Sequence, residues 1–458
     1  MEGLELHWAE KHELSAVREF YLRQNYSNPI SESDTILLAI IAGEVVAAVR
    51  LVSEQGFLVL RGMCVDGPWQ RKGVGTFLLR GLQNDMEREC FCVSLPHLDS
   101  FYKSAKFESV DDEEVPPFLV SRRAQYVDRG MPSVILKRPE IQRPNRQALE
   151  SVLRLWGETA FPVFIRKVEN FVYEILGKNK ILRLTQETHR SKAEVEAELQ
   201  WMAHLAADNI PLANPVKSEN DVYVESVSCL SGETCFAVIF ERAEGVPVHD
   251  VVRIDPLSLV TLGQKIGMMH DSTRSFPLTP NRKNWKTDDS FLMASECAEP
   301  DDGLAYDVFG RAVDWMNQLP VTPDCYGLVH ADIHPGNYFV SPSGRITLFD
   351  FDDCQYHWFS YDLSVPLFSL FLMSVEKEIE FDLHSHLQRL VEGYSSAFVV
   401  SPEWGERIPL FYYYRMALMY FWCKARRIKK DMEPDGLLAA GKLMGVCESG
   451  LKSCPQFV

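Results

Sequence analysis

Three polar residues in the second half of the chain have the types and the spacing that metal-assisted phosphoryl transfer requires. The segment HADIHPGN occupies residues 330–337, and LFDFD follows at residues 348–352. In such chemistry one carboxylate, here Asp332, orients an alcohol nucleophile, while an amide five residues later, Asn337, reaches a divalent metal ion. A second carboxylate, Asp350, bridges the metal and the phosphates, and such hard oxygen donors suit Mg²⁺.

A glycine-containing motif near the other end of the chain suits a different anion. The segment QRKGVG occupies residues 70–75, between an expected strand and an expected helix. Free N–H groups and the dipole at a helix N-terminus can hold a diphosphate, and Gly73 and Gly75 permit a close approach. A QxxGxG match alone is a weak signal, which the strand–loop–helix setting strengthens. The expected binding residues are Gln70, Arg71, Lys72, Gly73, Val74 and Gly75.

The composition favours a soluble enzyme over a nucleic-acid-binding protein. The 458 residues predict two to three domains, and 46% hydrophobic with 24% charged residues is ordinary for a globular chain. A net charge of −17 argues against binding to nucleic acid. The same charge either attracts a cationic substrate or simply belongs to a soluble protein.

Three features predict a cytoplasmic protein that does not contact a membrane. The first residues lack the basic start and apolar run of a signal peptide. The apolar stretch at 363–373 is short and contains Pro366, which predicts a buried helix rather than a membrane span. The eleven cysteines form no CxxC pair, so we expect reduced thiols and no zinc site.

The elements that must position these motifs can be predicted from hydrophobic periodicity. In the first part we expect strands at 35–41, 45–52, 57–65 and 90–95 and a helix over 77–86. Residues 137–145, KRPEIQRPN, are rich in Pro and Arg and mark a domain boundary. In the second part we expect β-type runs at 164–176, 180–185, 222–227 and 236–240, a helix over 192–207, and mainly helices afterwards.

The N-terminal part resembles the GNAT acetyltransferases over roughly residues 1–138. The resemblance rests on the QRKGVG loop and on the segment FYKSAKF at residues 101–107. It implies that the loop amides bind the pyrophosphate of acetyl-CoA, and that Tyr102 protonates the departing thiolate. Lys106 stands where this family usually has glycine. The alternative for Tyr102 is a half-buried aromatic residue that packs against Phe107.

No residue is clearly identified as the general base that an attacking amine requires. Glu54 follows an expected strand and is one candidate, while a solvated turn carboxylate is the alternative. Arg61 either contacts an acidic substrate or pairs with a neighbour.

The rest of the chain, roughly residues 148–458, resembles the aminoglycoside phosphotransferase and choline kinase-like superfamily. The HxDxxxxN segment and the acidic DxD that follows it carry this resemblance. It implies that Asp332 is the catalytic aspartate and that Asn337 and Asp350 bind Mg²⁺. His330 is usually a structural residue of this loop in the family.

The same resemblance implies a nucleotide site in a small β-rich lobe. Arg183 stands where a lysine usually contacts the phosphates, with Glu198 as its helix partner or Glu194 one turn earlier. The strand end at Glu241 and Ala243 would bind adenine through backbone atoms, which leaves both ATP and GTP open.

Together the two resemblances imply an α+β fold in two domains. Residues 1–138 form a GNAT domain with a mixed sheet and flanking helices, and residues 139–147 form a linker. Residues 148–458 form a protein-kinase-like domain, with a β-rich N-lobe at 148–243 and a helical C-lobe at 244–458.

We therefore expect a bifunctional enzyme that acts on small molecules. One activity is acetyl-CoA-dependent N-acetyl transfer, and the other is ATP- and Mg²⁺-dependent phosphorylation of a hydroxyl on an aminoglycoside or another hydroxylated metabolite. The alternative is a protein Ser/Thr kinase of the stress-response type, whose GNAT domain senses acetyl-CoA or acts separately. We expect neither a nucleic-acid partner nor a membrane partner, and the oligomeric state is not predicted.

Overall fold

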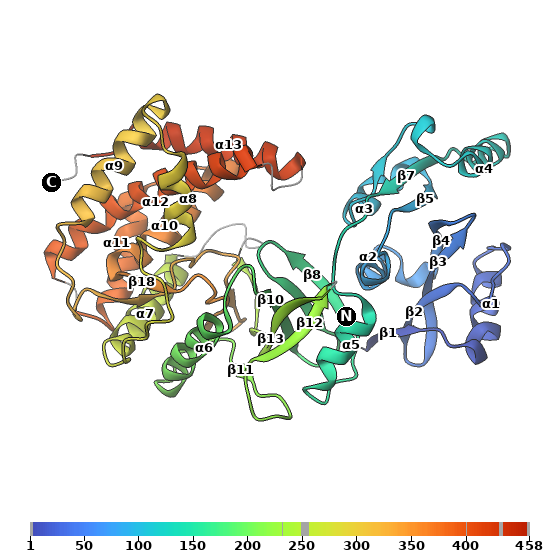
Figure 1. The fold of residues 1–458 in the computed structure, drawn as a ribbon, viewed down its shortest axis with the longest axis horizontal. Helices are drawn as coiled ribbons and strands as arrows, with labels where there is room; N and C mark the ends of the chain where they lie inside the picture. Colours follow the sequence, from blue (N-terminus) through green and yellow to red (C-terminus); the bar gives the residue numbers. More distant parts are fainter. Residues whose placement is uncertain (1–2, 231, 249–255, 400, 430–433, 456–458) are drawn as a thin grey trace. The chain divides into compact units, whose positions relative to one another are not determined.

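The computed structural model divides into two compact units (Figure 1). The first unit comprises residues 1–192 and 215–242, and the second comprises 193–214 and 243–458. The residues that the structure describes are 3–230, 232–248, 256–399, 401–429 and 434–455. Among the helices described, none combines the length and the apolar character that a membrane crossing needs.

The first unit begins with a seven-stranded mixed sheet in the order β1-β2-β3-β4-β5-β7-β6. Only β4 and β5 run parallel, and the other neighbours are antiparallel. The strands are β1 Leu4–Trp8, β2 Thr35–Ile41, β3 Glu44–Glu54, β4 Phe57–Val65, β5 Cys90–Ser94, β6 Glu108–Ser109 and β7 Val134–Arg138. The helices are α1 Leu14–Arg23, α2 Val74–Leu82, α3 Asp99–Lys103 and α4 Pro117–Asp128. The predicted mixed sheet with flanking helices is confirmed.

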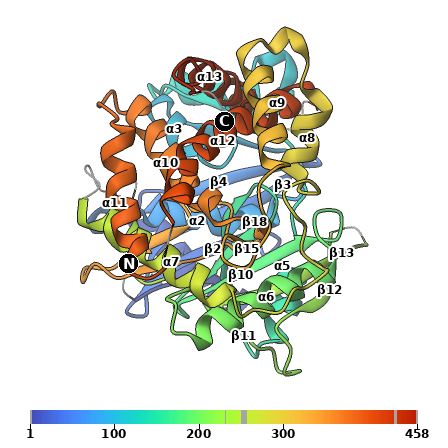
Figure 2. The ribbon, with the colours of Figure 1, turned by 90° about the vertical axis from the view of Figure 1, so that its left-hand side faces the viewer.

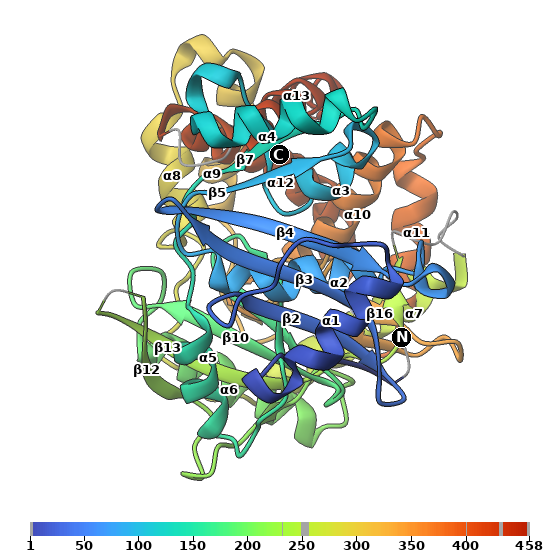
Figure 3. The same ribbon diagram turned by 90° about the vertical axis from the view of Figure 1, so that its right-hand side faces the viewer.

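Helices α1 and α2 cover opposite faces of this sheet, and Figure 3 shows α1 in front of it. Leu37 and Leu78 belong to the buried cluster on the α2 face. Leu38, the next residue along β2, packs with Phe20 in the cluster on the α1 face. Successive strand residues point to opposite faces, so the apolar run TILLAII supplies both cores.

A second sheet in the first unit has six strands. β13 lies at its centre, in the order β11-β13-β10-β9-β8 with β12 also paired to β13. The strands are β8 Pro162–Lys167, β9 Phe171–Ile175, β10 Lys180–Gln186, β11 Pro215–Val216, β12 Glu225–Leu230 and β13 Glu233–Glu241. Helix α5, Arg146–Arg154, packs Leu149, Val152 and Leu153 against this sheet, as their i, i+3 and i+4 spacing requires.

The segment expected to link two domains contacts both β8 and the turn that follows α2. The Arg143 guanidinium lies 3.8 Å from the centroid of the Phe164 ring, and it also donates a hydrogen bond to the Gln83 side chain. Val163 of β8 belongs to the same buried cluster as Leu78 of α2. The two sheets of the first unit therefore share part of one apolar core.

One pair of cysteines differs from the expected chemistry. Cys229 and Cys235 lie across the β12–β13 hairpin with Cα atoms 6.0 Å apart, and a disulfide joins them. A register shift between Ser228 and Leu230 interrupts the hairpin ladder beside Cys229, and both cysteines belong to one buried cluster. The prediction of reduced thiols is therefore wrong at this pair.

The second unit is mainly helical and holds two small sheets, β14-β16-β17 and β15-β18. The strands are β14 Val246–Pro247, β15 Tyr326–Val329, β16 Tyr338–Val340, β17 Ile346–Leu348 and β18 Gln355–Trp358. The helices are α6 Lys192–Ala207, α7 Pro256–Thr273, α8 Asp289–Cys297, α9 Leu304–Met316, α10 Phe359–Glu376, α11 Leu383–Ser395, α12 Pro402–Lys429 and α13 Pro434–Leu451. The helix predicted over 192–207 is confirmed as α6, and the apolar run at 363–373 lies in the buried helix α10.

Close contact between α7 and α11 depends on glycine. Figure 2 shows the two helices side by side. A Cβ atom on Gly263 would lie 2.0 Å from the Leu390 carbonyl oxygen, and one on Gly393 would lie 1.8 Å from that of Val260. Only a residue without Cβ lets the two backbones approach this closely.

Candidate active sites

Asp332 lies in the loop between β15 and β16, where three side chains converge on its carboxylate. Arg415 of α12 donates from Nη2 to Oδ1 at 3.0 Å. Asn337 donates from Nδ2 to Oδ2 at 3.0 Å, and also to the Asp332 main-chain oxygen at 3.0 Å. His334 Nδ1 accepts the Gly336 N–H, which leaves its Nε2, 3.4 Å from Oδ2, as the ring's donor.

These partners keep the Asp332 carboxylate ionised. Burial acts to raise its pKa, but the hydrogen bond and charge of His334 and the charge of Arg415 outweigh burial, so the pKa lies well below its usual range. Burial acts to lower the pKa of Arg415, and the neighbouring Tyr361 and Asp332 raise it on balance. At neutral pH the loop therefore presents a carboxylate that can accept a hydrogen bond and binds a proton only weakly.

Asn337 has the free acceptor that a metal ligand needs. Its Nδ2 is held by Asp332, while its buried Oδ1 accepts no hydrogen bond from any residue that the structure describes. A buried carbonyl oxygen without a donor is costly in a folded protein, and a cation offsets that cost. The Asn337 oxygen, one of the two donors predicted from the sequence, therefore fits a hard cation such as Mg²⁺.

The backbone on both sides of this site is held in an unusual conformation. Ala331, just before Asp332, has φ 65°, and Asp350, just after β17, has φ 64°. Residues with a Cβ atom rarely adopt such angles. Such backbone angles persist where surrounding contacts hold the chain in place.

Asp362 of α10 supplies those contacts for the loop. It is fully buried and accepts the N–H groups of His330 at 3.0 Å and Ala331 at 2.8 Å. His270 Nε2 of α7 lies 3.1 Å from the same carboxylate. The loop that carries Asp332 is therefore anchored to two helices of the second unit.

His330 has structural contacts at both ring nitrogens. The Asp332 N–H donates to its Nδ1 at 3.4 Å, and its Nε2 lies 3.1 Å from the Phe349 carbonyl oxygen. This agrees with the structural role that the family resemblance implies for His330. The catalytic role of Asp332 stays a prediction.

The predicted nucleotide residues fall in both units. Arg183 lies on β10, largely buried, with its guanidinium 5.0 Å from the centroid of the Phe240 ring. Glu198 of α6 is fully buried, whereas Glu194 is partly exposed. Arg183 and Glu241 belong to the first unit, while Glu198 and Ala243 belong to the second. The pairing of Arg183 with Glu198 and the adenine contacts stay predictions.

The loop Gln70–Gly75 lies between β4 and α2, as predicted. Gly73 precedes the helix with φ 85°, and Arg71 has φ 58°. The first N–H groups of a helix have no partner within it, so this turn points free donors at any anion bound there. A Cβ atom on Gly75 would lie 3.4 Å from the Phe101 ring, which places the FYKSAKF segment against the start of α2.

Tyr102 lies on α3, and the turn after it forms without the usual glycine. Lys106 adopts φ 67° there despite its Cβ atom. The Tyr102 ring packs edge-on against Phe107 with centroids 5.8 Å apart. Burial raises its pKa well above the usual range, and a hydrogen bond with the Ser94 side chain acts in the opposite direction. Tyr102 therefore retains its phenolic proton.

Glu54 is paired with two arginine residues rather than solvated. Arg61 Nη1 lies 2.9 Å from Oε1, and Arg122 of α4 forms a second ion pair with Glu54. Burial acts to raise the pKa of Glu54, but Arg122 and Arg61 together lower it. The solvated-carboxylate alternative for Glu54 is wrong, because α4 brings Arg122 to it, and its role as a base stays a prediction. Arg61 pairs with a neighbouring residue, Glu54, which is one of the two alternatives that the sequence left open for it.

Two family models match the chain. Residues 163–383 match the phosphotransferase enzyme family, and residues 8–116 match the acetyltransferase (GNAT) domain. Both resemblances inferred from the sequence are confirmed by these matches.

Individual relatives agree with the match to the phosphotransferase enzyme family. Amicoumacin kinase from Bacillus subtilis is 33% identical over 268 residues, which cover 56% of this chain and 78% of the relative. A homoserine kinase from Mesorhizobium japonicum is 26% identical over 253 residues, which cover 53% of this chain and 72% of the relative.

Solved structures with a kinase-like fold cover about two thirds of the chain. The amicoumacin kinase hAmiN in complex with AMP-PNP, Ca²⁺ and Ami aligns with a TM-score of 0.57 and 25% identity, over 67% of this chain and 93% of that one. A microcompartment-associated aminopropanol kinase aligns with a TM-score of 0.54 and 21% identity, over 68% of this chain and 98% of that one. The kinase-like fold predicted for this part is confirmed.

Proposed function

The chain belongs to the phosphotransferase enzyme family and carries a GNAT acetyltransferase domain ahead of it, and on this premise we propose that it transfers phosphoryl and acetyl groups to one class of small molecule. The phosphoryl group comes from ATP and goes to a hydroxyl, and the acetyl group comes from acetyl-CoA and goes to an amine. The observation that carries the proposal is the carboxylate of Asp332, held ionised by Arg415 and His334 beside the free oxygen of Asn337.

In the phosphoryl transfer, Asp332 accepts the hydrogen bond of the substrate hydroxyl and aims its oxygen at the phosphorus atom. Its low pKa suits this role, because a loose phosphoryl-transfer transition state needs positioning more than a strong base. Asn337 and Asp350 would hold Mg²⁺, which neutralises charge on the phosphates when bound. The residues that we expect to bind the nucleotide are Arg183, Glu198, Glu241 and Ala243.

In the acetyl transfer, the N–H groups of the Gln70–Gly75 loop hold the pyrophosphate of acetyl-CoA. The amine must arrive neutral to attack the thioester carbon. The amine nitrogen forms a bond to the thioester carbon, and as this intermediate collapses the carbon–sulfur bond breaks and Tyr102 gives its phenolic proton to the departing sulfur. The nitrogen loses its extra proton to water, and water returns a proton to the Tyr102 oxygen. A buried neutral phenol fits this role because it still carries that proton at neutral pH.

The substrate class we propose is a small molecule that carries both a hydroxyl and an amino group. The relatives support it, since one is named for amicoumacin and another for homoserine, a hydroxy amino acid. The net charge of −17 favours the approach of an ammonium ion. We place the protein in the cytoplasm, where ATP and acetyl-CoA are available.

A parallel turnover screen of the purified full chain tests this proposal. ATP-to-ADP and acetyl-CoA-to-CoA conversion are followed with amino alcohols, hydroxy amino acids, aminoglycosides and a generic protein. We expect at least one alcohol that carries an amino group to accelerate ATP turnover. The same compound should accelerate the release of CoA, because its amine accepts the acetyl group. If only the protein accelerates ATP turnover, the enzyme is a protein kinase and the small-molecule proposal is wrong.

A further inference from the structure

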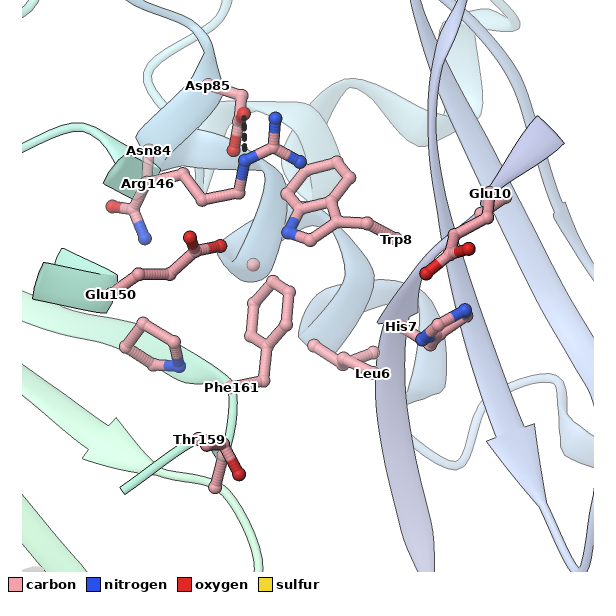
Figure 4. Close-up of a pocket in the computed structure, with 14 residues that line it drawn as sticks. Leu6, His7, Trp8, Glu10, Asn84, Asp85, Arg146, Glu150, Thr159 and Phe161 are labelled. Carbon is pink, nitrogen blue, oxygen red and sulfur yellow. Dashed lines mark ion pairs between the residues drawn. The ribbon is translucent and has the colours of Figure 1, made fainter. Parts of the chain in front are cut away.

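One pocket of the first unit contains none of the residues assigned above. Its volume is about 450 Å³, within the range of small-molecule sites. Strand β1, the C-terminal end of α2, helix α5 and the residues leading into β8 all contribute to its lining. The pocket therefore lies where the seven-stranded sheet meets the six-stranded sheet, within one compact unit (Figure 4).

The lining carries more negative than positive charge. Three carboxylates line it, from Glu10, Asp85 and Glu150, against one guanidinium, from Arg146. Arg146 Nε lies 3.5 Å from Asp85 Oδ1, and the arginine side chain is 41% exposed, so this ion pair neutralises Asp85 only weakly. His7 also lines the pocket, but it pairs with Glu13 at 2.7 Å. In Figure 4 the Glu150 carboxylate points into the space between Arg146 and Phe161.

Two buried oxygen atoms on the α2 side accept no hydrogen bond from the described residues. Asn84 is only 4% exposed, and its Oδ1 is buried without a hydrogen bond. Asp85 Oδ2 is likewise buried without one. Burial raises the pKa of Asp85 to about 6, with the charge of Arg146 acting against it. Buried acceptors without donors are rare in native proteins, and here both line the same pocket.

The remaining walls suit an organic cation. The rings of Trp8 and Phe161 lie 5.7 Å apart, and the Arg146 guanidinium lies 4.6 Å from the Trp8 centroid, so this aromatic wall already accommodates a cation. Gly81, Asn84 and Asp85 stand at or just beyond the C-terminal end of α2, where the helix dipole also favours positive charge.

We propose that this pocket binds a small organic cation, an ammonium or guanidinium group on an apolar body. The charged group lies between the carboxylates of Asp85 and Glu150, both of which line the pocket. The apolar body lies against Trp8 and Phe161. Such a ligand bridges α2, which begins at the Gln70–Gly75 loop, and α5 of the six-stranded sheet. The inference is independent of the function proposed above.

Matched probes test the charge requirement in the full chain without nucleotide or acetyl-CoA. Phenethylammonium is titrated by ligand-observed saturation-transfer NMR, alongside its neutral isostere phenethyl alcohol. We expect the ammonium to bind with a dissociation constant of about 1 mM and the alcohol at least about tenfold more weakly. Asp85→Asn and Glu150→Gln should each weaken ammonium binding by about fivefold to tenfold. Glu150 is exposed, so its variant retains the fold.

Glu19→Gln is the matched control, because Glu19 is an exposed carboxylate on α1, which covers the opposite face of the sheet from α2. It should leave ammonium binding unchanged. Equal binding of the alcohol and the ammonium overturns the proposal, as does ammonium binding that survives both pocket variants, which places the cation elsewhere. Absence of binding up to about 20 mM ammonium overturns it as well.

Discussion

The carboxylate of Asp332 joins elements that are distant in the chain. Arg415, 83 residues further on, donates to it and also to the Tyr361 hydroxyl at 2.9 Å. Asn337 holds the same carboxylate from within the loop. The nucleophile-orienting group of the proposed kinase site is therefore fixed by two local partners, Asn337 and His334, and one remote partner, Arg415.

Replacing Asp332 by alanine should abolish phosphoryl transfer while sparing acetyl transfer. The substrate hydroxyl loses its acceptor, so we expect kcat for ATP-dependent phosphorylation to fall by about 10²- to 10⁴-fold. The two activities are measured on the same preparation by ADP and CoA release. Equal loss of both would mean that the variant is misfolded or that the two sites are coupled.

Replacing Arg415 by methionine should move the acid limb of the phosphorylation pH profile upward. Asp332 acts in its ionised form, and its depressed pKa means that activity falls only when the pH drops far below neutral. Removing the guanidinium removes a charge that lowers this pKa, so the limb moves to higher pH. The measurement is kcat/KM against pH for the wild type and the variant.

Arg407→Met is the control for this shift. Arg407 lies on the same helix but pairs with Glu403. An unchanged acid limb in Arg415→Met, or an equal shift in Arg407→Met, would exclude Arg415 as the positioning residue of Asp332.

Single residues were predictable from the sequence only where a local motif contained them. Asp332 and Asn337 share one loop, so their spacing alone indicated metal-assisted chemistry. Arg415 on α12 and Arg122 on α4 lie in no motif, and each reaches its carboxylate only through tertiary packing. No periodicity in one sequence reports such a long-range ion pair, which is why Glu54 was misinterpreted.

At the scale of elements, the turn that begins α2 requires a glycine, because Gly73 has φ 85°. Replacing Gly73 by glutamate should block acetyl-CoA binding, because the new carboxylate repels the pyrophosphate and the φ of 85° disfavours any side chain. We expect affinity for acetyl-CoA to fall by at least about a hundredfold, measured by titration calorimetry.

Gly56→Glu controls for charge and backbone strain together. Gly56 has φ 87° in the turn between β3 and β4, and a Cβ atom on it would have no neighbouring atom within 4 Å. This variant carries the same substitution outside the Gln70–Gly75 loop, so it should bind acetyl-CoA with the affinity of the wild type. Wild-type affinity in Gly73→Glu would show that the loop does not hold the pyrophosphate.

Most elements were predictable because their apolar residues follow either a continuous run, as in a strand buried on both faces, or a helical period. The strands at 35–41 and 57–65 and the helix at 192–207 match the structure. The run at 164–176 is two strands, since residues 168–170 interrupt it, and the strand expected at 222–227 lies at Glu225–Leu230. Apolar residues predict burial but not the partner, so the packing of Val163 against α2 was not predictable.

At the scale of the whole molecule, the first unit should not separate cleanly at residues 139–147. A chain that begins at residue 148 lacks the seven-stranded sheet and exposes Phe161, Val163 and Leu176, which pack in its core. A side chain of this kind contributes about 1.5–3 kcal/mol to the free energy of unfolding when it is fully buried. We therefore expect this fragment to unfold at a lower temperature than the full chain, or to aggregate. Calorimetric unfolding of the fragment and the full chain measures the difference.

A chain that begins at residue 139 separates two explanations for that loss. It keeps Asn145, whose side chain caps α5 by accepting the Ala148 N–H at 2.9 Å, but it still lacks the sheet. Equal destabilisation of both fragments assigns the effect to the missing sheet rather than to the missing cap. A fragment that unfolds like the full chain would mean that the shared core contributes little.

The shared core of Leu78 and Val163 also has a consequence for synthesis. A ribosome delivers the last strand of the first sheet, ending at Arg138, before it delivers Val163 and Leu176. At about 5–20 residues per second, this gap lasts roughly 2–8 s. During that interval the nascent acetyltransferase sheet has an unfilled apolar face, which makes it a substrate for chaperones until translation of the next sheet closes it.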